Sequence, residues 1–210
     1  MIKVTLKDGK VLEVEKGKKI LEVAKQISEG LARMATCGEV NGKVEDLRYE
    51  LTEDCALNIC TFENSEEGKK AYWHTTAHIM AQSIKRLFPN VQLAIGPAIA
   101  NGFYYDFDTE HRFSEEDFVK IEAEMKKIIK EDLPLERFEL SREESIKLMK
   151  EAKESYKVEL IEELPEGEVI SFYKQGEYVD LCAGPHLMST GKVKAVKLLS
   201  TSGAYWRGDE

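Results

Sequence analysis

The chain has 210 residues, of which 42% are apolar, 30 are basic and 39 are acidic, so its formal net charge is −9. This acidity disfavours a stand-alone nucleic-acid binder, because sequence-independent affinity for a polyanion comes from cations that neutralise phosphates. No apolar run approaches the roughly 20 residues that a membrane span requires, so we expect a globular, cytoplasmic protein without a membrane partner. The four cysteines show no framework spacing, which favours reduced thiols over disulfides.

The first 62 residues predict a small α+β domain. Two segments of alternating polarity around an Asp8-Gly9 turn indicate a hairpin, and a helix and further strands follow. This order is typical of a β-grasp, ubiquitin-like domain, and it contains no catalytic constellation. The predicted elements are strands at 2–6 and 11–14, a helix from about Lys19 to Glu29 closed by Gly30, an Asn41-Gly42 turn and a strand at 56–62.

Residues 63 to 210 predict a larger α+β domain, which begins with a polar linker at 63–68. The helix that follows carries apolar residues at 4-3-4-3 spacing: Trp73, Ala77, Met80, Ile84 and Leu87. The later predicted elements are strands between 92 and 108 with Phe103, Tyr105 and Phe107 facing the core, a helix at 115–131 capped by Ser114 and Asp117, a helix from Ser141 and Glu144 to about Ser155, and strands and turns from Val158 onward, including 193–200 and 204–206.

Three of the four histidines lie in two short segments, His74-Thr-Thr-Ala-His78 and Cys182-Ala-Gly-Pro-His186. Side chains four residues apart on a helix project from one face within about 6 Å of each other. Because His74 and His78 flank the apolar stripe, we expect them at the rim of the packed face, beside a cleft. In the predicted strand that leads into the second segment, alternation places Tyr178, Asp180 and Cys182 on one face.

This set of residues allows two chemistries. Imidazoles titrate near neutrality, so they can activate water or protonate a leaving alkoxide, which suits ester hydrolysis. His74, His78, Cys182 and His186 also form a possible zinc-ligand set. A zinc peptidase is excluded, since His-Glu-x-x-His needs a glutamate where this chain has Thr75. An ATP-dependent step is not expected either, because no Gly-rich phosphate-binding loop is present.

Three further residues could have either a functional role or an ordinary structural role. Asp180 could hold a substrate cation, but an aspartate near a strand end is usually a surface or turn residue. Lys157 alone would most often be a solvated lysine, and Tyr104 would most often be half-buried packing.

At these residues the sequence resembles the amino-terminal half of a bacterial threonyl-tRNA synthetase. The first 62 residues resemble its TGS domain, and residues 63–210 resemble its editing domain. The His-x3-His and Cys-x3-His pairs also occur in alanyl-tRNA editing domains, whereas the leading module and the ending at 203–209 distinguish the threonyl family. The matching stretches are His74–His78, Ala94–Pro97, Asn101–Asp106, Ser155–Lys157, Tyr178–Cys182, Gly184–His186 and Gly203–Asp209.

The resemblance implies an aminoacyl-tRNA deacylase that removes serine from mischarged threonine tRNA, with that tRNA as partner. A threonine pocket gains only about 1–3 kcal/mol from one methyl group, so a second, hydrolytic site is needed. The sequence departs from the family's pattern at two positions: Ala183 stands where an arginine is common, and Ala100 stands where an aspartate is common. Both departures affect expected contacts to the tRNA end. The implied residues are His74, Lys157, His78 and His186 for catalysis, and Cys182, Asp180 (substrate amino group) and Tyr104 (terminal adenosine) for substrate binding.

The resemblance also implies that the editing site needs no metal and no cofactor. The ATP, magnesium and zinc sites of the full-length family lie outside these 210 residues, as do the domains expected to form its homodimer. Two alternatives stay open. One is a zinc-dependent hydrolase of the alanyl type, with zinc on His74, His78, Cys182 and His186, and the other is a non-catalytic RNA-binding module built on the TGS domain.

Overall fold

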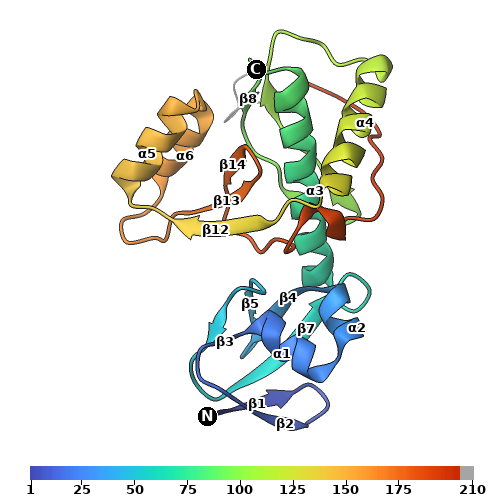
Figure 1. The fold of residues 1–210 in the computed structure, drawn as a ribbon. Coiled ribbons are helices and arrows are strands. Elements are labelled where there is room, and N and C mark those ends of the chain that lie inside the picture. Colours follow the sequence, from blue (N-terminus) through green and yellow to red (C-terminus); the bar gives the residue numbers. More distant parts are fainter. Residues whose placement is uncertain (204–210) are drawn as a thin grey trace. The chain divides into compact units, whose positions relative to one another are not determined.

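The computed structural model describes residues 1–203 and has an α+β fold in two compact units (Figure 1). The first unit contains Met1–His74 together with Gly184–Met188, and the second contains Thr75–Ala183 and continues from Ser189. Within residues 1–203, no helix has the length and apolar character needed to cross a membrane. The strand expected at 204–206 and most of the 203–209 motif lie outside the described residues.

The first unit has the predicted β-grasp topology. A five-stranded sheet has the order β2-β1-β7-β4-β5, in which β1 and β7 are parallel and the other neighbours are antiparallel. Side chains such as Val4, Val23 and Leu57 form its core. The elements are β1 (Ile2–Leu6), β2 (Val11–Val14), β3 (Lys18–Lys19), α1 (Ile20–Ile27), α2 (Glu29–Met34), β4 (Ala35–Val40), β5 (Lys43–Glu45), β6 (Glu50–Leu51) and β7 (Cys55–Thr61).

The single helix predicted at 19–29 is in fact two helices. Helix α1 ends at Ile27, and the Ser28 hydroxyl accepts a hydrogen bond from the Leu31 backbone N–H at the start of α2. This capping bond satisfies a donor that the start of a helix otherwise leaves free. Gly30 therefore lies inside α2, and the prediction that it closes the first helix is wrong.

The predicted linker is shorter than expected, because helix α3 (Glu66–Leu87) already begins within it. The Gly68 N–H donates to the Ser65 hydroxyl at 3.0 Å. A Cβ atom at Gly68 would lie 2.1 Å from the backbone oxygen of Thr61, so the close approach of α3 to the end of β7 requires glycine here. The prediction that the linker extends to residue 68 is wrong, because residues 66–68 form the first turn of the helix.

The middle of α3 is buried on all sides from Thr75 to Ile84. Gln82 donates to the backbone oxygen of Gln175 at 3.1 Å, and Gln175 donates back to the Gln82 side chain at 2.8 Å. His78 is only 3% exposed, so its predicted place at the rim of the packed face is wrong. The polar face of an amphipathic helix normally faces solvent, but here polar side chains of the same unit, such as Asp180, cover His78.

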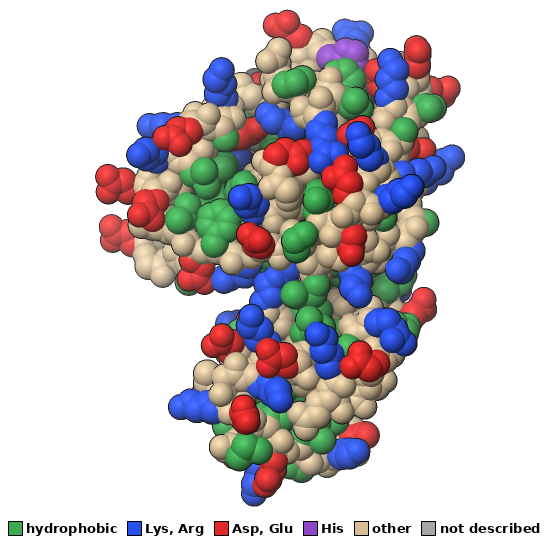
Figure 2. Space-filling view, viewed as in Figure 1, with side chains coloured by type: hydrophobic (Ala, Val, Ile, Leu, Met, Phe, Trp, Pro, Cys, Tyr) green, Lys and Arg blue, Asp and Glu red, His purple; other side chains and the backbone are tan. Residues whose placement is uncertain are grey.

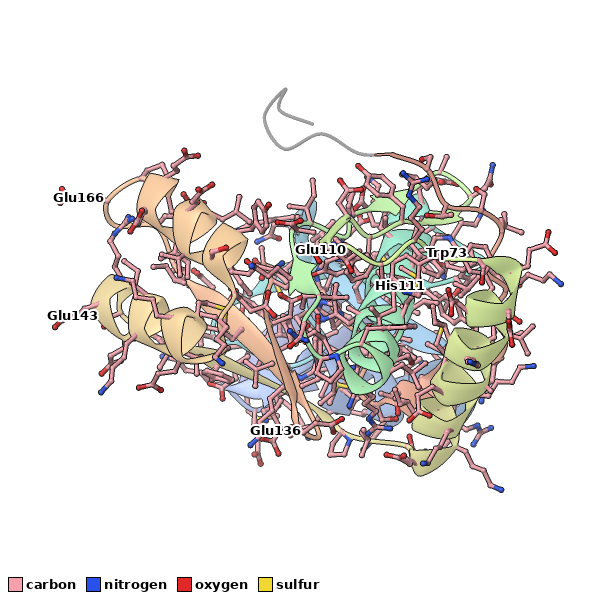
Figure 3. All side chains as sticks on the ribbon, turned by 90° about the horizontal axis from the view of Figure 1, so that it is seen from above. Trp73, Glu110, His111, Glu136, Glu143 and Glu166 are labelled. Carbon is pink, nitrogen blue, oxygen red and sulfur yellow. The ribbon has the colours of Figure 1, made fainter. Side chains whose placement is uncertain are left out.

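The second unit combines α3 and α4, which lie side by side in Figures 1 and 3, with a three-stranded antiparallel sheet of order β12-β13-β14. The Ser114–Asp117 capping box at the start of α4 is confirmed. Glu143 and Glu166 point outward from the α5–α6 pair (Figure 3). The remaining elements are β8 (Gln92–Leu93), β9 (Ala98–Ile99), β10 (Gly102–Phe103), β11 (Phe107–Asp108), α4 (Glu115–Glu131), β12 (Leu135–Glu139), α5 (Arg142–Glu151), α6 (Ser155–Glu163), β13 (Ser171–Gln175), β14 (Tyr178–Leu181) and η1 (Thr190–Lys192).

Two predictions for the second unit are wrong. The sequence predicts strands and turns from Val158 onward, but α6 continues to Glu163, because Val158 and Ile161 pack into one cluster with Met149 of α5. Residues 193–200 form no strand; the chain ahead of them makes the short helix η1, where Thr190 donates to the Ile128 carbonyl at 2.8 Å. Tertiary packing determines the secondary structure of both segments, because their short apolar runs by themselves are equally compatible with a strand.

Candidate functional site

A buried carboxylate forms the centre of the second unit. Asp180 is 1% exposed, and its Oδ1 atom lies 3.0 Å from the Lys157 Nζ atom. Its Oδ2 atom accepts hydrogen bonds from the hydroxyls of Tyr105 and Tyr178, both at 2.8 Å, and lies 3.3 Å from the Nε2 atom of His78. An ammonium, an imidazole and two phenols therefore surround one carboxylate, and we call these five residues the Asp180 cluster.

The five members of the cluster come from four segments of the chain. His78 lies on α3 and Lys157 on the first turn of α6. Tyr178 and Asp180 point to the same side of β14 because alternate residues of a strand share a face, as predicted. Tyr105 reaches the cluster from the segment between β10 and β11, and its ring fills the space beside Gly96, where a Cβ atom would lie 2.1 Å from the ring.

The electrostatics of the cluster favour an ionised aspartate. Burial by itself would raise the pKa of Asp180, but the nearby charges of Lys157 and His78 and the hydrogen bonds outweigh burial, so the pKa is lowered. The pKa values of Tyr105 and Tyr178 are raised well above their ordinary range, first by burial and then by the Asp180 charge. Both phenols therefore remain hydrogen-bond donors at neutral pH.

The first unit brings together a second pair of predicted residues. The rings of His74 and His186 are stacked, with centroids 5.4 Å apart and planes 23° apart. His186 is fully buried, and the backbone of the segment that contains it is held by Asp46 and Arg48. Two residues more than a hundred positions apart thus meet, as the matched motifs predicted.

The other predicted site residues are placed as follows. Cys182, which is partly exposed, ends the β14 segment in the second unit, and its carbonyl accepts a hydrogen bond from the Ser171 hydroxyl at 2.6 Å. Tyr104 is 42% exposed, so part of this residue is accessible from the surface. The expected zinc set draws His74 and His186 from the first unit and His78 and Cys182 from the second, and it stays a prediction.

The ordinary readings of Lys157 and Asp180 are wrong. Lys157 is 4% exposed rather than solvated, and Asp180 is buried rather than a surface or turn residue. Sequence reasoning also missed the part played by Tyr105 and Tyr178. Alternation places Tyr178 on the face of Asp180 and Tyr105 in the core, but no local signal shows which core tyrosine reaches a distant carboxylate.

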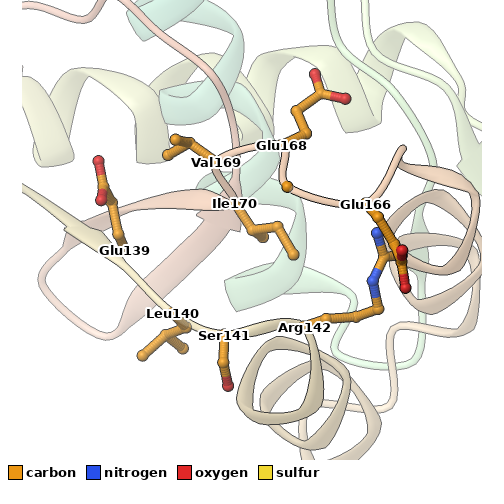
Figure 4. A pocket seen from close by; sticks show the side chains of 9 residues that line it. Glu139, Leu140, Ser141, Arg142, Glu166, Glu168, Val169 and Ile170 are labelled. Carbon is orange, nitrogen blue, oxygen red and sulfur yellow. The ribbon is translucent and has the colours of Figure 1, made fainter.

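A separate hollow of about 320 Å³ lies between the start of α5 and the loop that follows α6 (Figure 4). The Arg142 guanidinium at its edge donates to backbone carbonyls at the end of α6, including Ile161 at 2.5 Å and Leu164. Arg142 thereby caps α6 from α5 and keeps the helix that carries Lys157 in place. None of the predicted catalytic residues lines this hollow.

Two protein-family models match the chain. Residues 2–61 match the TGS domain, and residues 170–210 match the threonyl and alanyl tRNA synthetase second additional domain. The first match confirms the domain type expected for the β-grasp unit. The second match contains β13, β14 and the Cys182-to-His186 segment.

Curated relatives match the whole chain. It is 67% identical over 210 residues to a threonine–tRNA ligase of Acetivibrio thermocellus, of which it covers 33%. It is 67% identical over 207 residues to one of Caldanaerobacter subterraneus subsp. tengcongensis (32% of that protein), and 62% identical over 210 residues to one of Clostridium tetani (33%). The chain thus spans about a third of the length of these relatives. The resemblance inferred from the motifs is confirmed: the chain corresponds in sequence to the amino-terminal third of bacterial threonine–tRNA ligases, with a TGS domain followed by the second additional domain that threonyl and alanyl enzymes share.

Proposed function

We propose that this chain hydrolyses the ester bond of seryl-tRNA that carries the threonine acceptor, as the editing part of a cytoplasmic threonine–tRNA ligase. The observation that carries the proposal is the buried Asp180 cluster, in which Lys157 and His78 face one ionised carboxylate. A polar set of this kind is costly to bury and is concentrated at functional sites. The longer protein would supply the ligase core and its homodimer contacts.

The reaction adds a water oxygen to the ester carbonyl carbon and breaks the bond between that carbon and the ribose oxygen. A base takes one water proton, and the ribose oxygen gains a proton as it leaves, which yields serine and free tRNA. We assign His74 as the base that accepts the water proton, since a neutral imidazole accepts a proton near pH 7. The Lys157 ammonium supports charge that develops on oxygen, and His78 and His186 complete the catalytic set.

Substrate recognition is assigned to three residues. The Oδ1 atom of Asp180 contacts Lys157, and a carboxylate oxygen offers two acceptor directions, so the second can receive the substrate ammonium group. Tyr104, which is 42% exposed, would stack near the terminal adenosine. Cys182 would line the space beside the aminoacyl group. The acidity of the chain implies that segments outside it provide most of the cationic contacts to tRNA.

The zinc-dependent alternative has one supporting observation, the stacked His74–His186 pair, because neutral imidazoles are common zinc ligands. A zinc-dependent hydrolase would lose activity to a chelator and regain it with added zinc. The non-catalytic alternative predicts tRNA binding without turnover. The metal-free proposal predicts turnover that a chelator leaves unchanged.

The experiment offers seryl- and threonyl-tRNA to the 210-residue chain and to its His74→Ala and Lys157→Met variants. We expect faster release of serine than of threonine, and a loss of about 10²- to 10⁴-fold in His74→Ala. His111→Ala is the matched control, because His111 is an exposed histidine that contacts Asp117 at the start of α4. Equal turnover by the wild type and His74→Ala would contradict the proposal.

A further inference from the structure

The Asp46-Leu47-Arg48 turn of the TGS unit holds the backbone that carries His186. Arg48 Nη1 donates to the His186 carbonyl at 3.2 Å, and Nη2 donates to the Leu187 carbonyl at 2.9 Å. Asp46 Oδ2 accepts a hydrogen bond from the His186 N–H at 3.1 Å. Three hydrogen bonds therefore fix two consecutive residues of the Gly184–Met188 segment to this turn.

Hydrogen bonds within the turn and the burial of Leu47 hold the turn in place. Arg48 Nη1 donates to Asp46 Oδ1 at 2.7 Å, and the Arg48 N–H donates to the same oxygen at 2.9 Å. Leu47 between them is 1% exposed, and its carbonyl accepts a hydrogen bond from the N–H of Leu21 in α1. The Arg48 guanidinium is therefore held in place by a turn that packs against the β-grasp core. A guanidinium that is already positioned loses little conformational entropy when it binds carbonyls.

The geometry points to Asp46 and Arg48 as positioning residues for His186, so that the TGS unit takes part in seryl-ester hydrolysis and does more than bind RNA. The inference rests on the proposed function, because it assumes that His186 serves the reaction. The His186 imidazole stacks on His74, so a shift of the His186 backbone moves the ring against the residue assigned to water activation. A displacement of about 1 Å at such a group can cost on the order of a hundredfold in rate.

The test compares Arg48→Ala, Arg48→Lys, Asp46→Asn and His186→Ala in the 210-residue chain. Rates of seryl-tRNA hydrolysis are measured across pH and separated into kcat and KM. Arg48→Ala is expected to lower kcat by about tenfold to a hundredfold with little change in KM. Arg48→Lys should recover part of the loss, since one ammonium keeps the charge but cannot fork between two carbonyls.

Lys43→Ala is the matched control, because Lys43 forms an ion pair with Glu45 at the surface of the same unit and is 82% exposed. It should leave kcat unchanged. If Arg48 acts through His186, adding Arg48→Ala to His186→Ala should cause no further loss of kcat. A fully additive double variant, or an Arg48→Ala enzyme equal to the Lys43→Ala control, would overturn the inference.

Amide hydrogen exchange at His186 gives a readout that does not depend on activity. The exchange should be faster in Asp46→Asn and in both Arg48 variants, while thermal unfolding shows whether each variant is folded. If Arg48→Ala is unfolded, the comparison with the wild type is made with Arg48→Lys and Asp46→Asn instead. A wild type no faster than His186→Ala contradicts the proposed function, whereas unchanged exchange in all folded variants contradicts only the positioning role.

Discussion

The Nζ atom of Lys157 lies 3.0 Å from the Oδ1 atom of Asp180, and both side chains are almost completely buried. Separating charges from water costs several kcal/mol for each ion, and a close partner offsets that cost. Neither residue can therefore be changed alone without leaving a buried charge. The pair links α6 to β14 and sets the position of the ammonium that we assign to the reaction.

We predict that Asp180→Asn lowers the free energy of unfolding by about 3–5 kcal/mol, because it leaves the Lys157 charge without its carboxylate. The double variant Asp180→Asn with Lys157→Met should lose less than the sum of the two single variants. Urea denaturation measures all three. Removing Arg137 from its surface pair with Glu139 is the control and should cost no more than about 1 kcal/mol. Additive losses would argue against a coupled pair.

The two phenols should each stabilise the fold through Asp180. Tyr178→Phe and Tyr105→Phe each remove one hydrogen bond to a charged acceptor, which is worth about 1.5–3 kcal/mol. Tyr156→Phe is a matched control, since its hydroxyl meets Asp108 at the exposed surface, and we expect a change within about 0.5 kcal/mol. Chemical denaturation compares the three, and equal losses would show that the buried bonds are not special.

Gly96→Ala should destabilise the second unit. The added methyl group would lie 2.1 Å from the Tyr105 ring, which is itself stacked on Phe107 at 5.0 Å between centroids. The ring must shift, and its hydroxyl then leaves Asp180, so we expect a loss of about 1–3 kcal/mol from overpacking. Gly30→Ala is the control, because the nearest atom to its Cβ lies at an ordinary 3.5 Å. A Gly96→Ala protein as stable as the control would refute the prediction.

Stability should fall in acid partly because Glu177 is protonated. Its hydrogen bonds with Arg86 lower the pKa of Glu177 from 4.5 to about 2. A carboxyl group whose pKa is lowered on folding stabilises the protein above pH 4.5, and this contribution is lost as the pH falls from 4.5 to about 2.

The matching variant is Glu177→Gln, which should flatten the dependence of the urea midpoint on pH within that window. Because Glu177 is more than half exposed, solvent screening limits the effect to about 1 kcal/mol or less. Glu166→Gln, at an exposed carboxylate in the loop after α6, is the control. The space-filling view in Figure 2 shows acidic and basic side chains interspersed on the visible face, where screening of this kind applies. A Glu177→Gln curve parallel to that of the wild type would rule out the assignment.

Local sequence signals predicted the elements that depend on neighbours in the chain. The hairpin of β1 and β2 follows from alternation around Asp8-Gly9, and α4 follows from the Ser114 cap with Asp117 three residues on. Local signals are ambiguous where two patterns compete for the same residues. Gly30 is typical of a helix end, but Ser28 two residues earlier caps a new helix, and the structure follows the cap. The boundary between the two domains at residue 62 stays a prediction.

The sequence by itself determined the family, the β-grasp order of the first unit and the two motifs that hold the candidate residues, because these are properties of residue type and spacing. Only the tertiary structure decided that Lys157 is buried against Asp180 and that Tyr105 donates a hydrogen bond to the same carboxylate. It also decided that Asp46 and Arg48 form hydrogen bonds with the His186 backbone. Such contacts join residues that are 23 to 140 positions apart in the chain. No local pattern encodes them, since burial and charge pairing are settled only when the packed core brings those segments together.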